Sequence, residues 1–172
     1  MKRLRLAFTV AAFTFAVAVC ADEVKLSNVH LCCNACVKGA EKAAAKAAGA
    51  TVTVDKDAGT VAISASNKAA IQQAVDALVA AGYYGKSSDA SVKLAANAGA
   101  TDAKVSSLKL EGVHLCCAKC VTAVQKAVSS VAGVKGNTAE KNAKVFEVTG
   151  DFSAKAVLDA LHNAGLTGNV AK

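Results

Sequence analysis

Beyond residue 21 the sequence contains no methionine, arginine, proline or tryptophan, and its only aromatic residues are Tyr83, Tyr84, Phe146 and Phe152. Proteins that bind nucleic acids hold phosphates with arginine and stack bases on aromatic rings. The scarcity of both argues against nucleic-acid binding, and the excess of lysine is typical of a solvated surface. The lack of methionine also removes the thioether, a soft ligand available to copper proteins.

There is one long apolar run, Leu6–Val19, followed by small residues and then by Asp22. A positively charged segment precedes it, with Lys2, Arg3 and Arg5. This arrangement predicts a secretory signal peptide over residues 1–21. The run is shorter than the roughly 20 residues of a membrane span, and no second run follows. We therefore expect an exported protein, periplasmic or extracellular, without a membrane span. Lipid anchoring at Cys20 is the less favoured alternative, because bulky Val19 precedes it.

Six of the seven cysteines form two groups, Cys32, Cys33, Cys36 and Cys116, Cys117, Cys120. An even number of cysteines in an exported protein usually indicates disulfide bonds. Disulfides that stabilise a fold, however, join distant parts of the chain. Cysteines crowded into five residues cannot do so, and their crowding predicts a binding site instead.

The two cysteine groups belong to an internal repeat. Residues 24–49 recur 84 positions later as residues 108–133, and farther along the chain the offset is 83. A stretch rich in Ala, Ser, Asn and Asp separates the copies and is typical of a linker. The predicted organisation is a signal peptide (1–21), a first unit (22–88), a linker (89–106) and a second unit (107–172).

Both units show the same succession of hydrophobic patterns. Period-2 alternation predicts a first strand, helical spacing predicts a helix after the cysteines, and two further strands, a second helix and a short last strand follow. In the first unit these patterns rest on Val24 and Leu26, on Val37, Ala40 and Ala44, on Val52 and Val54, on Val61 and Ile63, and on Ile71, Val75 and Leu78. In the second unit Gly136 and Asn137 interrupt the second strand. The expected fold class is α+β, with two tandem ferredoxin-like βαββαβ sandwiches.

A strand, a Cys-x-x-Cys loop, a helix and a later Gly-Tyr resemble the heavy-metal-associated domain of copper chaperones, mercury-binding periplasmic proteins and metal-ATPase tails. The resemblance covers residues 23–88 and 107–172. It implies a non-enzymatic protein that binds Cu(I), Zn(II), Hg(II) or Cd(II), and it implies a metal donor or acceptor protein as a partner. The ligand pairs it implies are Cys33 with Cys36 and Cys117 with Cys120. Tyr83 stands where many bacterial members carry a Tyr beside the metal, and Leu166 replaces it in the second unit.

The chemistry of the motif independently favours a soft metal. A helix start stabilises thiolates through its free N–H groups and its dipole, and thiolates select Cu(I) and Zn(II) over Mg(II) and Ca(II). The sequence departs from the family at His30 and His114 and at the extra Cys32 and Cys116. We expect these extra cysteines to give a three-sulfur site, with His30 and His114 as optional ligands. We expect a monomer that binds one Cu(I) or Zn(II) ion per unit, unless the linker lets both loops share one ion.

The alternative is a thiol–disulfide oxidoreductase of the cell envelope, which also places Cys-x-x-Cys between a strand and a helix. Thioredoxin-like domains are longer than one unit and set a cis-proline against the active cysteines. This chain contains no proline. Metal content and insulin reduction distinguish the two functions.

Overall fold

The computed structural model describes residues 22–95 and 99–171. The expected signal peptide and Cys20 lie outside the described residues. Among the residues that are described, no helix is long and apolar enough to cross a membrane.

The first unit begins with β1 (Asp22–Ser27), α1 (Asn34–Ala44) and β2 (Ala50–Asp55), and continues with β3 (Thr60–Ala65), α2 (Lys68–Ala80) and β4 (Lys86–Ser87). Its strands form one antiparallel sheet in the order β2-β3-β1-β4. Asn67 caps α2 by accepting a hydrogen bond from the N–H of Ala70, and Gly82 ends it with a φ of 85°.

The second unit repeats this order with β5 (Lys104–Glu111), α3 (Ala118–Ser129), β6 (Val134–Asn137), β7 (Val145–Ser153), α4 (Ala154–Asn163) and β8 (Asn169–Val170). Its antiparallel sheet has the order β6-β7-β5-β8. The interruption expected at Gly136 is confirmed as a shift of strand register between Val134 and Gly136. The two tandem ferredoxin-like units predicted from the sequence are therefore confirmed.

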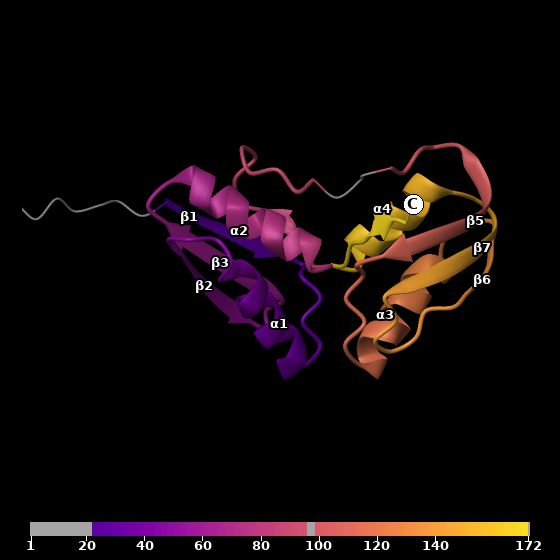
Figure 1. The fold of residues 1–172 in the computed structure, drawn as a ribbon, viewed down its shortest axis with the longest axis horizontal. Helices are drawn as coiled ribbons and strands as arrows, with labels where there is room; N and C mark the ends of the chain where they lie inside the picture. Colours follow the sequence, from indigo (N-terminus) through magenta and orange to yellow (C-terminus); the bar gives the residue numbers. More distant parts are fainter. Residues whose placement is uncertain (1–21, 96–98, 172) are drawn as a thin grey trace, which may run out of the picture.

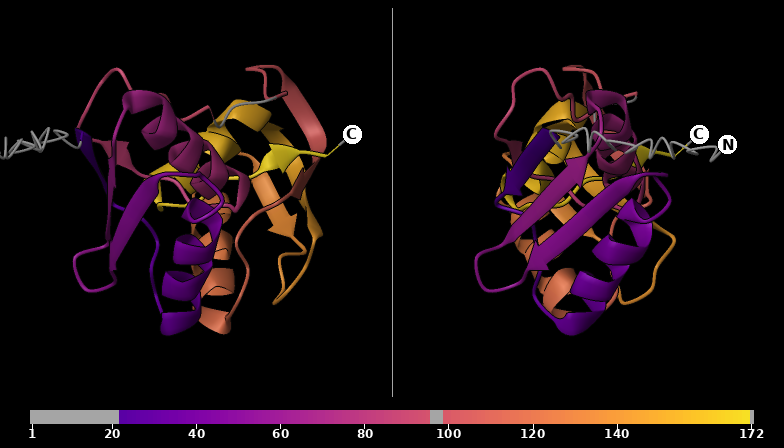
Figure 2. Two further views of the ribbon diagram at one scale, coloured as in Figure 1. Left: turned by 60° about the vertical axis from the view of Figure 1, so that its left-hand side comes forward. Right: turned by 90° about the vertical axis from the view of Figure 1, so that its left-hand side faces the viewer.

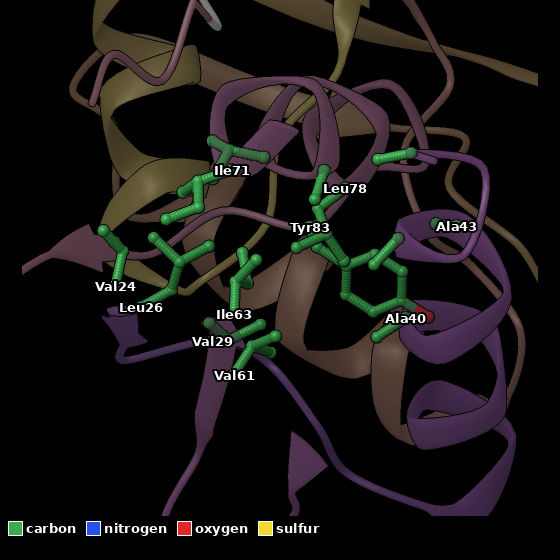
Figure 3. Packing of buried hydrophobic residues seen from close by; sticks show 14 of the residues in the cluster. Val24, Leu26, Val29, Ala40, Ala43, Val61, Ile63, Ile71, Leu78 and Tyr83 are labelled. Carbon is green, nitrogen blue, oxygen red and sulfur yellow. The ribbon is translucent and has the colours of Figure 1, made fainter. Parts of the chain in front are cut away.

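Each unit has its own hydrophobic core between its sheet and its helices. In the first unit Val24, Leu26, Ile63 and Ile71 are almost fully buried, as the sequence patterns predict. Figure 3 shows the Tyr83 ring in the same core, with its hydroxyl directed toward α1. The second core is built around Phe146 and Phe152 together with Leu and Val side chains. Burial of this kind supplies most of the stability of such small units.

The segment after β4 packs on the first unit. Val92 is buried in that core, and the side chain of Gln72 exchanges hydrogen bonds with the backbone of Lys93. Lys68 forms an ion pair with Asp89. Ordered contacts thus extend beyond residue 88, and β5 begins at Lys104, inside the stretch expected to be the linker.

The two units lie beside each other (Figure 1), and the segments that lead into α1 and α3 run along the sides that face each other. In Figure 2 the strands of the first sheet lie on the side of the unit away from the second unit. The cysteine loops are therefore at the junction between the units.

Candidate metal centre

Each Cys-x-x-Cys motif spans the start of a helix. Cys33 is the residue before α1 and Cys117 is the residue before α3, and both have extended backbone conformations. One helical turn then brings the later cysteine to the same side. The Sγ atoms are 3.6 Å apart for Cys33 and Cys36 and 3.7 Å apart for Cys117 and Cys120. Free N–H groups and the positive end of the helix dipole lie here and favour thiolates.

The extra cysteine of each motif also faces the site. Neighbouring residues in an extended loop point to opposite sides, so Cys32 can approach Cys36 only if the loop curls. The structure shows such a curl in both units: Sγ of Cys32 is 3.6 Å from Sγ of Cys36, and the matching distance from Cys116 to Cys120 is 3.7 Å. The motif therefore presents three sulfurs to one region.

Sulfurs of the two units meet at the junction. Sγ of Cys32 is 3.4 Å from Sγ of Cys120 and 3.5 Å from that of Cys117. Sγ of Cys36 is 3.6 Å from Sγ of Cys116 and 3.7 Å from that of Cys120. We refer to the Sγ atoms of Cys32, Cys33, Cys36, Cys116, Cys117 and Cys120 as the six-sulfur cluster. All six are free thiols, Cys36 and Cys120 are fully buried, and the other four are half-buried.

Triangles of sulfurs in this cluster combine both units. Four triangles close with every side between 3.4 and 4.0 Å. They are Cys36-Cys116-Cys120, Cys33-Cys36-Cys116, Cys32-Cys36-Cys120 and Cys32-Cys117-Cys120. Each contains cysteines of both units, so a three-sulfur ligand set at these positions requires both loops.

His114 completes one of these triangles. A ring nitrogen of His114 and the sulfurs of Cys36, Cys116 and Cys120 all lie within 4.8 Å of one another. The Tyr83 hydroxyl lies 3.2 Å from Nε2 of His114 and donates a 2.8 Å hydrogen bond to the carbonyl of Cys36. When Nε2 of His114 keeps its contact with Tyr83, Nδ1 of the same ring is left to bind a metal. The result is a Cys₃His set, one of the known structural zinc sets.

His30 takes the equivalent place in the first unit, but its surroundings differ. Its ring lies within the same 4.8 Å limit of the sulfurs of Cys32 and Cys120. Leu166 stands where Tyr83 stands on the other side and offers no hydrogen bond. Within the described residues Nε2 of His30 is buried and has no hydrogen-bond partner. Leaving such an atom unpaired costs about 1–3 kcal/mol, so this side of the cluster fits a further ligand.

The junction itself is pseudo-symmetric. Tyr83 and Leu166 form an antiparallel bridge, and the N–H groups of His30 and Tyr84 both donate to the carbonyl of Gly165. In return the N–H of Thr167 donates to the carbonyl of Gly82. The turn after the second helix of each unit thus contacts the other unit, at the loop before the cysteines or at the matching turn. This arrangement places the two loops in register with each other.

The charges of the cluster are unevenly distributed. The hydrogen bond from Cys120 lowers the pKa of Cys36 to about 2, and a backbone N–H bond from Cys120 lowers the pKa of Cys117 to about 6. Burial raises the pKa of Cys32 to about 12 and raises that of Cys116, whereas the pKa of Cys120 rises chiefly through its bond to Cys36. Burial also lowers the pKa of His30. These shifts favour the thiolate at Cys36 and Cys117 and the thiol at Cys32, Cys116 and Cys120.

All eight residues predicted as ligands lie at this junction: His30, Cys32, Cys33 and Cys36 of the first unit, and His114, Cys116, Cys117 and Cys120 of the second. The sequence patterns did not reveal Tyr83 as a hydrogen-bond partner of the site. His162 also lies near the junction, although the sequence patterns gave it no role. It stacks on Tyr84 with ring centroids 3.9 Å apart and bonds the Thr167 hydroxyl.

The fold and the site together define a protein of two βαββαβ units with a cysteine and histidine cluster that could hold a metal ion. No protein-family model and no curated protein matches the chain. Among solved structures it is similar to the solution structure of the N-terminal soluble domains of Bacillus subtilis CopA, with 16% sequence identity and a TM-score of 0.34. The alignment covers 88% of this chain and 94% of that chain. The fold assignment rests on the strand order of the chain itself.

Proposed function

We propose that this chain is an exported protein that captures a soft metal ion, Cu(I) or Zn(II), in a centre to which both units contribute ligands. The observation that carries the proposal is the approach of Cys36 to Cys116 and Cys120, three sulfurs that come from both loops. The metal is cargo, taken up and passed on or buffered, and the chain is not an enzyme.

The donor set fits this cargo. At a metal–sulfur distance of about 2.3 Å, two sulfurs on one tetrahedral ion are about 3.8 Å apart. The sides of the Cys36-Cys116-Cys120 triangle are 3.6–3.7 Å, and His114 supplies the fourth ligand. Little rearrangement is needed to accept one Zn(II) ion, or one Cu(I) ion on the sulfurs alone.

Exposure of the ligands supports an exchangeable ion. Of the four ligands, His114 and Cys116 are half-buried. The sulfur of buried Cys120 lies 3.4 Å from that of half-buried Cys32 and 3.7 Å from that of half-buried Cys117. His114 and Cys116 line a pocket of about 390 Å³. A thiol of a donor or acceptor protein can reach such sulfurs and replace them one at a time. This accessibility favours metal delivery or buffering over a sealed structural site.

The metal proposal is tested by anaerobic titration of the reduced chain with Zn(II) and with Cu(I), each against a chromogenic chelator. Cys36→Ser removes a sulfur of the Cys36-Cys116-Cys120 triangle and should weaken retention of both metals at least about tenfold, or about 1.4 kcal/mol. Ala35→Ser adds the same hydroxyl to an exposed neighbour and is the matched control. Equal retention by both variants would contradict a site at the junction.

Export and the competing function are tested separately. Protein recovered from outside the cytoplasm should begin near Asp22. Recovery of a lipid-modified Cys20 at the N-terminus would instead indicate a lipid-anchored protein. Catalysis of insulin reduction together with no metal retention would favour the oxidoreductase.

A further inference from the structure

The ten sulfur separations of 3.4–4.0 Å match ten of the twelve edges of an octahedron. The two remaining edges join neighbouring cysteines, Cys32 with Cys33, whose sulfurs lie within 4.8 Å of each other, and Cys116 with Cys117. In this octahedron the opposite corners are Cys32 and Cys116, Cys33 and Cys120, and Cys36 and Cys117. Each opposite pair joins one unit to the other. No single unit can form the octahedron, because three corners come from each loop.

An octahedron of sulfurs offers triangular faces, and an ion on a face has three sulfur ligands. Cu(I) is satisfied by two or three thiolates, whereas Zn(II) favours four ligands. At a metal–sulfur distance of about 2.3 Å, three sulfurs around one ion are about 4.0 Å apart. The closed triangles of the six-sulfur cluster have sides of 3.4–4.0 Å, close to this value.

Alternate faces of an octahedron number four, and together they touch every corner twice. Four ions on such faces would therefore make each of the six thiolates a bridge between two ions. The sulfurs are already shared in this way. Cys120 lies near His114 in one group of ligand atoms and near His30 in another. Cys32 lies in the group of His30 and also in a third group, with Cys33 and Cys117, whose sulfurs are all within 4.8 Å of one another.

We infer that the junction binds a polynuclear Cu(I)–thiolate cluster, with four Cu(I) ions bridged by the six cysteine sulfurs. This inference rests on the proposed function and extends it from one ion to a cluster. Zn(II), by contrast, occupies only the Cys₃His set of Cys36, Cys116, Cys120 and His114.

Charge favours the cluster over a single ion once all six thiols have lost their protons. Six thiolates carry a charge of −6, which four Cu(I) ions reduce to −2 and which one Zn(II) ion reduces only to −4. Uncompensated charge is costly where ligands are buried, and Cys36 and Cys120 are fully buried. The buried Nε2 of His30 lies on the side of the cluster that the Zn(II) set leaves without metal.

The test is titration of the purified, reduced chain with Cu(I) in the absence of oxygen, followed by native mass spectrometry and copper K-edge X-ray absorption. The species with four Cu(I) should appear at low loading and exceed the species with fewer ions, and copper–copper scattering should accompany it. Zn(II) should give one ion per chain. His114→Gln should weaken Zn(II) binding at least about tenfold, yet leave the Cu(I) endpoint at four.

Cys117→Ser opens one corner of the octahedron and should lower the Cu(I) endpoint, whereas Ala118→Ser, at the exposed next position, should not. An endpoint of one or two Cu(I) ions without copper–copper scattering would overturn the cluster and leave the proposed function intact. A chain that retains neither Cu(I) nor Zn(II) would overturn both the cluster and the proposed function.

Discussion

Two glycines offer a matched test of whether the junction assembles the metal centre. Gly82 follows α2 with a φ of 85°, and Gly49 follows α1 with a φ of 79°. Substitution by alanine at either position forces an L-residue into the left-handed region, which costs about 1–2 kcal/mol. For units of this size 1 kcal/mol lowers the melting temperature by about 4–8 °C, so both variants should lose stability by similar amounts from this source.

The neighbours of the two glycines differ. A Cβ at Gly49 meets nothing within 4 Å, whereas a Cβ at Gly82 would lie 2.5 Å from the N of His114 and 2.6 Å from the carbonyl of Gly112. Ordinary van der Waals contact begins at 3.4 Å, so the backbone of the second unit must move away from the new Cβ by about 0.9 Å. Because His114 leads directly to Cys116, sulfurs across the junction should separate beyond the roughly 4.0 Å that three sulfurs around one ion allow.

We expect Gly82→Ala to weaken metal retention against a chelator by at least about tenfold, or about 1.4 kcal/mol, while Gly49→Ala keeps wild-type retention. Thermal unfolding without metal confirms that both variants are folded. Gly165→Ala, whose Cβ would meet the backbone of Asn28 and His30, should match Gly82→Ala. Wild-type retention in Gly82→Ala would refute the argument that the contact between units builds the site.

Other measurements probe the hydrogen bonds, the protons and the core. Tyr83→Phe removes the hydroxyl that contacts His114 and should weaken Zn(II) binding by about tenfold or more; unchanged affinity would show that the contact orients nothing. Because the thiols of Cys32, Cys116 and Cys120 have raised pKa values, they keep their protons at pH 7 until a metal binds. Metal loading in weak buffer at pH 7 should therefore release protons, which a pH-stat measures, and the metal affinity should fall as the pH falls. Phe152→Ala should lower the free energy of unfolding by about 3–5 kcal/mol, and a urea midpoint unchanged from wild type would contradict its place in the core.

The fold was predictable because its determinants are local. Each strand and helix carries its own period of apolar residues, and Ile71 and Leu78 are buried at the spacing that predicts α2. Glycines at the ends of helices and the short turn between β2 and β3 then leave few ways to connect the elements. Gly136 and Asn137 likewise predicted the irregular strand in the second unit.

The relation between the units was not predictable in the same way. The junction is made by backbone groups of Gly82 and Gly165 and by a tyrosine and a leucine at matching positions, which form no periodic pattern. His30 and His114 are equivalent in the repeat, yet only His114 faces Tyr83. The sequence could therefore identify every candidate ligand, but it could not show that ligands of different units lie together. The expectation of one ion per unit remains a prediction for the titration to decide.

The repeat also has a consequence for how such a chain can evolve. A duplication usually frees one copy to change, because the other copy preserves the original activity. Here three corners of the octahedron come from each copy, so a cysteine lost from either copy damages a property of the pair. Neither copy is a spare for the other. The parts that remain free to diverge are those that do not face the junction, such as the outer strands and the segment that joins the units.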